Sequence, residues 1–95
     1  MSASATLTAA SQPGLSPHAR LRHDGARGGW VLLGPERVLM LDEIAAEILT
    51  LCDGAASIGA IADALAQRHA APPAAVLNDV LEMLQDLRDK GLLTA

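Results

Sequence analysis

The stretch WVLLGPERVLMLD, residues 30–42, decides the fold of this chain. It contains two apolar runs, residues 30–33 and 38–41, separated by the turn residues 34–37. Short apolar runs bounded by glycine and proline are typical of strands joined by a tight connection. Because the connection is short, the two runs pair as antiparallel neighbours.

The residues before this stretch predict one more strand. Residues 19–24 alternate small or apolar side chains with charged ones, which is the period-2 pattern of a half-buried strand. The glycine-rich segment 25–29 follows as a turn. With residues 30–33 as the central strand and residues 38–41 as the third, we expect a three-stranded antiparallel meander.

Helical signals follow the third strand. Asp42 is a suitable N-cap for a helix over residues 43–52. Gly54 is expected to end this helix, because glycine readily adopts the left-handed conformation found just after helices. The spacing of four apolar residues predicts one buried face, made of Ile44, Ile48, Leu51 and Cys52.

Two more helices are predicted downstream. Ser57 caps a helix over residues 58–69, and the following proline pair starts a third helix that runs to about Lys90. Gly91 stops this helix, and residues 92–93 are expected to fold back as an apolar clip. The apolar stripe of the third helix is Val76, Leu77, Val80, Leu81, Leu84 and Leu87.

Three strands followed by three helices predict an α+β domain. We expect an N-terminal three-stranded antiparallel β-meander followed by a three-helix bundle, winged-helix-like in organisation. This domain would span residues 18–95. Residues 1–17 are rich in Ser, Thr, Ala and Pro with two sizeable apolar side chains, so we expect a flexible N-terminal tail there.

Composition and charge narrow the function. Hydrophobic residues make up 51% of the chain, with 19 Ala and 16 Leu but one Trp and neither Phe nor Tyr. The lack of rings disfavours a protein that stacks on single-stranded nucleic acid. Residues 1–37 carry a net charge of +2 and residues 38–95 a net charge of −6. The acidic helical half would repel phosphate, and no apolar run is long enough to suggest a membrane partner.

Motifs for catalysis or metal binding are not evident. His18, His23, His69 and Cys52 lack the spacing of zinc ligands, and no serine-nucleophile motif occurs. The single cysteine excludes an internal disulfide and is typical of a cytoplasmic protein, in which we expect it to pack as an inert apolar residue. We therefore expect neither enzymatic activity nor a cofactor.

Three classes of binding protein remain. One is a winged-helix DNA-binding transcription factor, which the acidic charge disfavours. Another is a structural subunit whose meander docks permanently on an enzyme. The third binds a polypeptide at the meander edge, where N–H and C=O groups are unpaired. The strand at residues 38–41 is apolar on both faces, so either both faces are buried or one is a patch that a partner covers.

Two motifs in the same order and spacing resemble the PqqD family of pyrroloquinoline quinone (PQQ) biosynthesis. They are LLGPE, residues 32–36, and ILTLCDG, residues 48–54. The resemblance covers about residues 17–93. Asp42 stands where the family commonly has Asn, a change that a capping role tolerates.

The resemblance implies a recognition element for a ribosomally made, post-translationally modified peptide (RiPP). Such proteins are chaperones that bind the precursor peptide PqqA by strand addition and present it to the radical SAM enzyme PqqE. The peptide lies along the third strand, in a groove closed by the third helix. Carried over to this chain, the peptide-binding residues are Arg37, Val38, Leu39, Met40, Leu41, Val76, Asp79, Val80, Met83 and Leu87.

Some roles within this groove stay open. Met83 either gives the groove an adaptable thioether or fills a gap in the core. Asp79, Glu82 and Asp86 either meet basic groups of the precursor or form a solvated face. We expect Asp at Met40 or Val80 to weaken peptide binding without unfolding the domain. The exposed strand edge also predicts a monomer or a weak homodimer.

Overall fold

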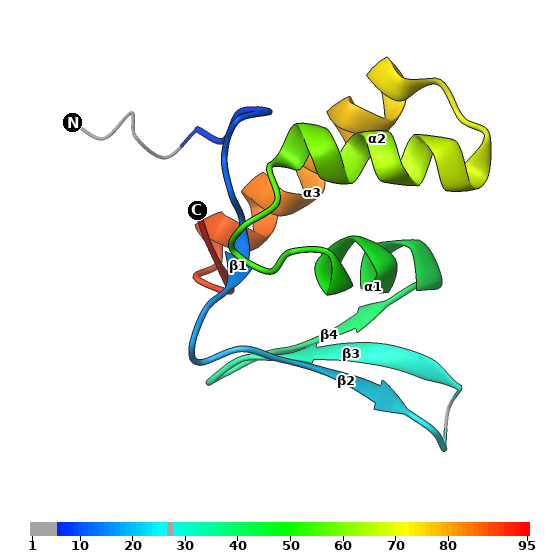
Figure 1. Cartoon of the computed structure of the whole chain (residues 1–95). Helices are drawn as coiled ribbons and strands as arrows, with labels where there is room; N and C mark the ends of the chain where they lie inside the picture. Colours follow the sequence, from blue (N-terminus) through cyan, green and yellow to red (C-terminus); the bar gives the residue numbers. More distant parts are fainter. Residues whose placement is uncertain (1–5, 27) are drawn as a thin grey trace.

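The predicted strands and helices occur in the expected order. The computed structural model describes residues 6–26 and 28–95. The elements are β1 (Gly14–Leu15), β2 (Arg20–Asp24), β3 (Gly29–Leu33), β4 (Val38–Leu41), α1 (Glu43–Thr50), α2 (Ile58–His69), α3 (Pro73–Asp89) and β5 (Leu93–Thr94). The α+β fold class, with antiparallel sheets and three helices, is confirmed (Figure 1).

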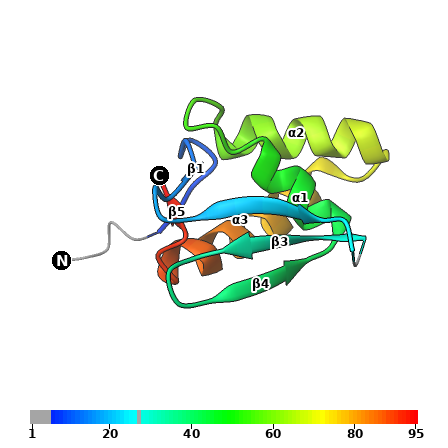
Figure 2. The same ribbon diagram turned by 90° about the horizontal axis from the view of Figure 1, so that it is seen from below.

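The larger sheet has the strand order β2-β3-β4 and is antiparallel throughout. Leu32, on the central strand β3, pairs with Leu21 on one side and Leu39 on the other. Leu32 is fully buried and its two partners pack against the same core, so this row of side chains points to the helices. All three helices lie on that side of the sheet, and the other side faces outward (Figures 1 and 2).

Two of the helices begin at the capping residues that the sequence predicted. The Asp42 carboxylate accepts a hydrogen bond from the Ala45 N–H at 2.7 Å, and the Ser57 hydroxyl accepts one from the Ala60 N–H at 3.1 Å. Gly54 has φ 84°, the left-handed conformation expected for it, but it does not end α1, because the C-cap of that helix is Leu51. Helix α1 ends at Thr50, two residues earlier than predicted. Among the described residues, no helix is long and apolar enough to cross a membrane.

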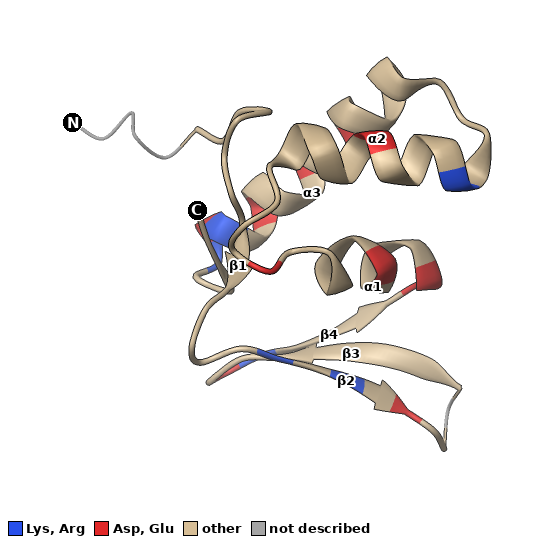
Figure 3. Cartoon of the chain, in the orientation of Figure 1, with Lys and Arg blue, Asp and Glu red and all other residues tan. Residues whose placement is uncertain are grey.

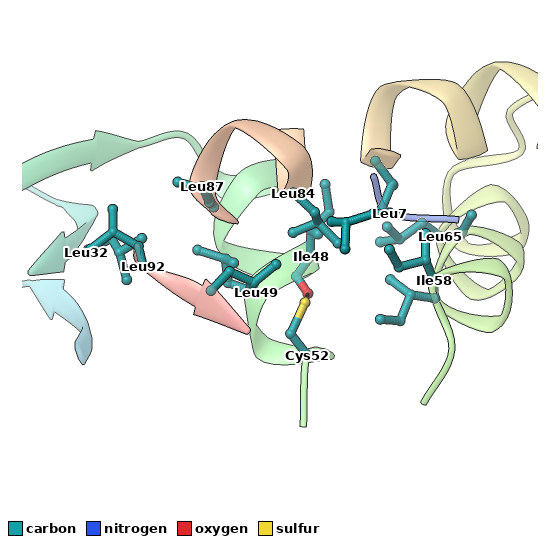
Figure 4. Packing of buried hydrophobic residues seen from close by; sticks show 14 of the residues in the cluster. Leu7, Leu32, Ile48, Leu49, Cys52, Ile58, Leu65, Leu84, Leu87 and Leu92 are labelled. Carbon is teal, nitrogen blue, oxygen red and sulfur yellow. Dashed lines mark hydrogen bonds between the residues drawn. The ribbon is translucent and has the colours of Figure 1, made fainter. Parts of the chain in front are cut away.

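The core is aliphatic and joins the sheet to the helices (Figure 4). Leu92 is 1% exposed, and the chain that follows it forms β5, as expected of an apolar clip. Cys52 packs in the same cluster, with its Sγ donating to the Ile48 carbonyl at 3.3 Å. Burial, helped by the charge of Asp53, raises the pKa of the Cys52 thiol to about 12. The prediction that Cys52 packs as an apolar residue is confirmed.

The expectation of a flexible tail over residues 1–17 is wrong for residues 6–17. Leu7 is buried, and its N–H donates to the Gln85 Oε1 of α3 at 2.7 Å. Strand β1 pairs with β5 at the other end of the chain. A two-residue strand is too short to show a hydrophobic period, and its partner lies about 80 residues away. Residues 1–5 lie outside the described residues.

Candidate functional site

Strand β4 forms one edge of the larger sheet. It pairs with β3, and no second strand pairs with it among residues 6–26 and 28–95. Val38 and Met40 are each 60% exposed, whereas Leu39 and Leu41 are half-buried against the core. One face of β4 is therefore open, which decides between the two alternatives that its apolar sequence allowed.

The main-chain groups of β4 alternate as the side chains do. The Gly34 N–H donates to the Arg37 carbonyl at 2.9 Å and closes the turn between β3 and β4. In an antiparallel pair, hydrogen-bonded and non-hydrogen-bonded positions alternate. Counting from that bond along the register, Val38 and Met40 occupy the non-hydrogen-bonded positions. Their N–H and C=O groups point to the open edge, as the addition of another strand requires.

The other predicted strand residues turn their main chains inward. Arg37 lies in the turn just before β4, and its carbonyl is committed to Gly34. Leu39 and Leu41 occupy the hydrogen-bonded positions opposite β3. Arg37, Leu39 and Leu41 therefore hold the hairpin together, whereas the N–H and C=O groups at the open edge come from Val38 and Met40.

The predicted residues on α3 fall into two groups. Val80 and Leu87 are 1% and 4% exposed and lie in the core, so they support the helix from within. Asp79 is exposed, and Val76 and Met83 are half-buried. These last three residues are the accessible part of the predicted wall. The opposite flank of α3 is partly covered by the N-terminal segment, where Leu7 bonds to Gln85.

A hollow of about 190 Å³ lies beside this wall, among the three helices. It brings Val76, Asp79 and Val80 together with residues that the sequence did not assign to a site: Ile44, Ile48, Leu65, His69 and Ala71. The strand residues Val38 and Met40 line a different hollow, on the outer face of the sheet. The structure therefore divides the predicted residues between two hollows. The α3 residues lie at the hollow among the helices, and Val38 and Met40 lie at the hollow on the outer face of the sheet.

Ile44 lines the hollow among the helices, and the sequence did not predict it as part of a site. Its periodicity places it on the buried stripe of α1, but it is 49% exposed and lines the hollow beside Val76. Ile44 lies in the first turn of α1, only three residues after Leu41 of β4. Its place in the first turn of α1 could have indicated this exposure, because here the first turn extends beyond the core that the later turns of the helix cover.

An ion-pair cluster holds one rim of the hollow. Glu47 of α1 accepts from Arg68 Nη1 at 2.8 Å, and its other carboxylate oxygen lies 2.8 Å from His69 Nε2. The bond from Arg68, followed by the one to His69, lowers the pKa of Glu47 below its usual value. These contacts tie the end of α2 to α1 and position His69 at the rim of the hollow.

Residues 29–93 match the family model described as coenzyme PQQ synthesis protein D (PqqD). A PqqA binding protein of Bradyrhizobium diazoefficiens is 54% identical over 89 residues, which cover 94% of this chain and 86% of the relative. A PqqA binding protein of Xanthomonas euvesicatoria is 45% identical over 87 residues, covering 92% and 95% of the two chains. The similarity therefore extends over nearly the whole of each relative.

Two solved structures are similar as well. The solution structure of the PqqD truncation of Methylobacterium extorquens PqqCD, described as a functional and stand-alone RiPP recognition element, has a TM-score of 0.84 and 38% identity. The match covers 96% of this chain and 98% of that one. The crystal structure of PqqD from Xanthomonas campestris has a TM-score of 0.60 and 41% identity, with 95% and 100% covered.

Proposed function

Because this chain belongs to the coenzyme PQQ synthesis protein D (PqqD) family, we propose that it is a peptide chaperone of PQQ biosynthesis. It binds the precursor peptide PqqA by strand addition and presents it to the radical SAM enzyme PqqE. The observation that carries this proposal is the open edge of β4, where Val38 and Met40 direct their N–H and C=O groups away from β3.

An added peptide strand gains affinity from the main chain and specificity from its side chains. Its side chains alternate between the two faces of the extended sheet. Those on the outer face lie beside Val38 and Met40. Those on the helix side meet Val76, Asp79 and Met83, and the hollow beside Ile44 can accept one apolar side chain. The exposure of Val38, Met40 and Asp79 supports this division of contacts, and the half-buried Val76 and Met83 remain partly accessible.

Charge adds a second element of recognition. Asp79, Glu82 and Asp86 are exposed along α3. The Lys90 ammonium bonds to Asp86, while Asn78 donates to Glu82 at 3.2 Å. Asp79 borders the hollow directly. We propose that Asp79 meets a basic group of the precursor, and that the other two belong to the solvated face.

The chaperone role requires no chemistry from this chain. Among residues 6–26 and 28–95, no group of three or more His, Cys, Asp or Glu could hold a metal ion. The buried thiol of Cys52 has a raised pKa and is therefore a poor nucleophile. We propose that this chain binds and presents the peptide and that the partner enzyme carries out the reaction.

The alternative, a winged-helix DNA-binding transcription factor, is opposed by charge. Helix α3 exposes Asp79, Glu82, Asp86 and Asp89. A helix placed in the major groove gains affinity from Lys and Arg that neutralise phosphates, and carboxylates oppose that contact. The winged-helix-like description of the fold remains a prediction.

The β4 edge also allows two copies to pair when no peptide is bound. We propose a monomer in weak equilibrium with a homodimer joined at this edge. Because both contacts use the same N–H and C=O groups, PqqA displaces the second copy. Sedimentation velocity with and without the peptide tests this competition, and a dimer that persists in saturating peptide would contradict it.

The decisive test of the function is a calorimetric titration of synthetic PqqA into the full chain. We expect a saturable one-to-one complex, and amide signals of Val38 and Met40 that shift in a parallel NMR titration. A scrambled PqqA peptide is the control. Absence of binding, or equal binding of the scrambled peptide, overturns the proposal.

A further inference from the structure

The outer face of the β2-β3-β4 sheet has an ordered pattern of charge and apolar surface. Side chains next to the inward row of Leu32 point outward, because successive residues of a strand face opposite sides. Two outward rows cross the three strands, each with one Arg on β2 followed by two apolar residues: Arg20, Leu33 and Val38 in one, and Arg22, Val31 and Met40 in the other.

This face is open to solvent. No described helix covers it (Figure 1). Arg20 and Arg22 are exposed, and among residues 6–26 and 28–95 neither forms an ion pair. A hollow of about 520 Å³ lies over the face, lined by Arg22, His23, Asp24, Gly25, Val31, Leu33, Val38 and Met40. Asp24, at the far end, accepts from the Ala26 N–H in the adjoining turn.

The outer face of the sheet is more basic than the helical side of the molecule. Figure 3 shows basic residues along β2, with an acidic residue at the end of that strand, and acidic residues on α1, α2 and α3, with basic residues at the ends of α2 and α3. Residues 38–95 carry a net charge of −6, and the whole chain −4. The net negative charge of the helical side repels an acidic protein, whereas Arg20 and Arg22 attract it to the outer face of the sheet, and this difference orients its approach.

We propose that the outer face of this sheet is the docking surface for the modifying enzyme, through an acidic surface of that enzyme that carries an apolar strip. Carboxylates of the enzyme pair with Arg20 and Arg22, and the strip covers the apolar residues of β3 and β4. This inference rests on the proposed function, since it assigns the face on which the peptide is presented.

The arginines of the outer face lie apart from the β4 edge where the peptide binds, but both belong to the same sheet. The arginines lie on β2, two strands or roughly 10 Å from β4. A peptide strand added to β4 would extend the outer face by one strand, with alternate peptide side chains beside Val38 and Met40. An enzyme docked on this face contacts the chaperone and the bound peptide together. The face is about 15 Å across, a size suited to a transient contact.

The test uses the full chain, synthetic PqqA and purified PqqE from the same organism. The double variant Arg20→Glu, Arg22→Glu is expected to bind PqqE about tenfold or more weakly at low salt, and PqqA within twofold of wild type. Lys90→Glu, a charge reversal at the end of α3, is the control and leaves both affinities unchanged. Thermal melts verify that the variants are folded.

The outcomes separate this inference from the proposed function. If PqqA binds but PqqE binds the double variant as tightly as wild type, the docking surface is wrong and the chaperone role stands. If wild type binds no PqqA, the proposed function itself fails. If labelled duplex DNA binds wild type but not the double variant, the arginines bind phosphate. If the double variant loses self-association, the arginines contact a second copy of this chain. Either result overturns the docking surface.

Discussion

The Gly34 amide and the Arg37 carbonyl form a 2.9 Å hydrogen bond that sets the alternation along β4. Because this bond places Arg37 in a hydrogen-bonded position, Val38 and Met40 turn their main-chain groups to the open edge and their side chains to the outer face. Leu39, between them, does the opposite. The hydrogen bond between Gly34 and Arg37 thus determines which main-chain groups of β4 a peptide can reach.

Proline substitution distinguishes the two kinds of position on β4. Met40→Pro removes an N–H that points to solvent, which an edge strand tolerates, and should weaken PqqA binding about five- to tenfold while the domain stays folded. Leu39→Pro removes an N–H that bonds to β3 and should unfold the meander. Titration calorimetry and circular dichroism measure the two effects. Met40→Ala controls for the lost side chain, and equal affinities of the Pro and Ala variants would refute the edge assignment.

Substitutions on α3 separate the core from the accessible wall. The structure corrects the expectation that Val80→Asp leaves the domain folded: Val80 is 1% exposed, so a buried carboxylate should cost about 3–5 kcal/mol of unfolding free energy. Met83→Ser, at a half-buried site, should keep the fold and weaken PqqA binding severalfold. Urea unfolding and calorimetry report the two quantities. A Met83→Ser variant with lower stability and unchanged affinity would make Met83 a core filler.

The N-terminal segment should contribute measurable stability. Leu7 is 8% exposed in the hydrophobic cluster, so Leu7→Ala should lower the free energy of unfolding by about 2 kcal/mol. Thr6→Ala, at the exposed neighbouring residue, is the matched control and should have little effect. Urea denaturation of both variants measures the difference. Equal unfolding midpoints for Leu7→Ala and wild type would show that the N-terminal segment does not stabilise the domain.

The Glu47 cluster predicts a pH dependence of stability. Its bonds to Arg68 and His69 lower the folded-state pKa of Glu47 below the ordinary 4.5. A lowered folded-state pKa stabilises the fold above pH 4.5, and that stabilisation is lost as the pH falls through the folded-state value. Glu47→Gln should therefore cost less than about 1 kcal/mol at pH 7, since the pair is near the surface.

Urea unfolding of wild type and Glu47→Gln at pH 7 and pH 3 tests this dependence. The difference between the two proteins should be smaller at pH 3. Asp53, whose pKa is lowered by bonds from the Ala56 and Ala55 amides, titrates in both proteins and cancels in the comparison. A difference that is as large at pH 3 as at pH 7 would show that the substitution disturbs packing instead.

Much of the fold could be predicted because its signals are local. The helix over residues 58–69 was predicted with its observed bounds, since Ser57 caps it and the proline pair follows. The tight turn at residues 34–37 likewise indicated the hairpin of β3 and β4. The pairing of β1 with β5 could not be predicted, because it joins short segments at opposite ends of the chain that carry no periodic pattern.

The sequence alone therefore determined the order of strands and helices, the acidic helical half and the family resemblance, all of which depend on neighbouring residues and residue counts. Only the tertiary structure decided which apolar residues are available to a partner. Periodicity places Ile44 and Ile48 on one stripe, but the fold exposes the first and buries the second. On α3, Met83 and Val80 both belong to the predicted groove, but the first is half-buried and the second lies in the core. The physical reason is that exposure depends on what other elements cover, and that is a property of packing between distant segments.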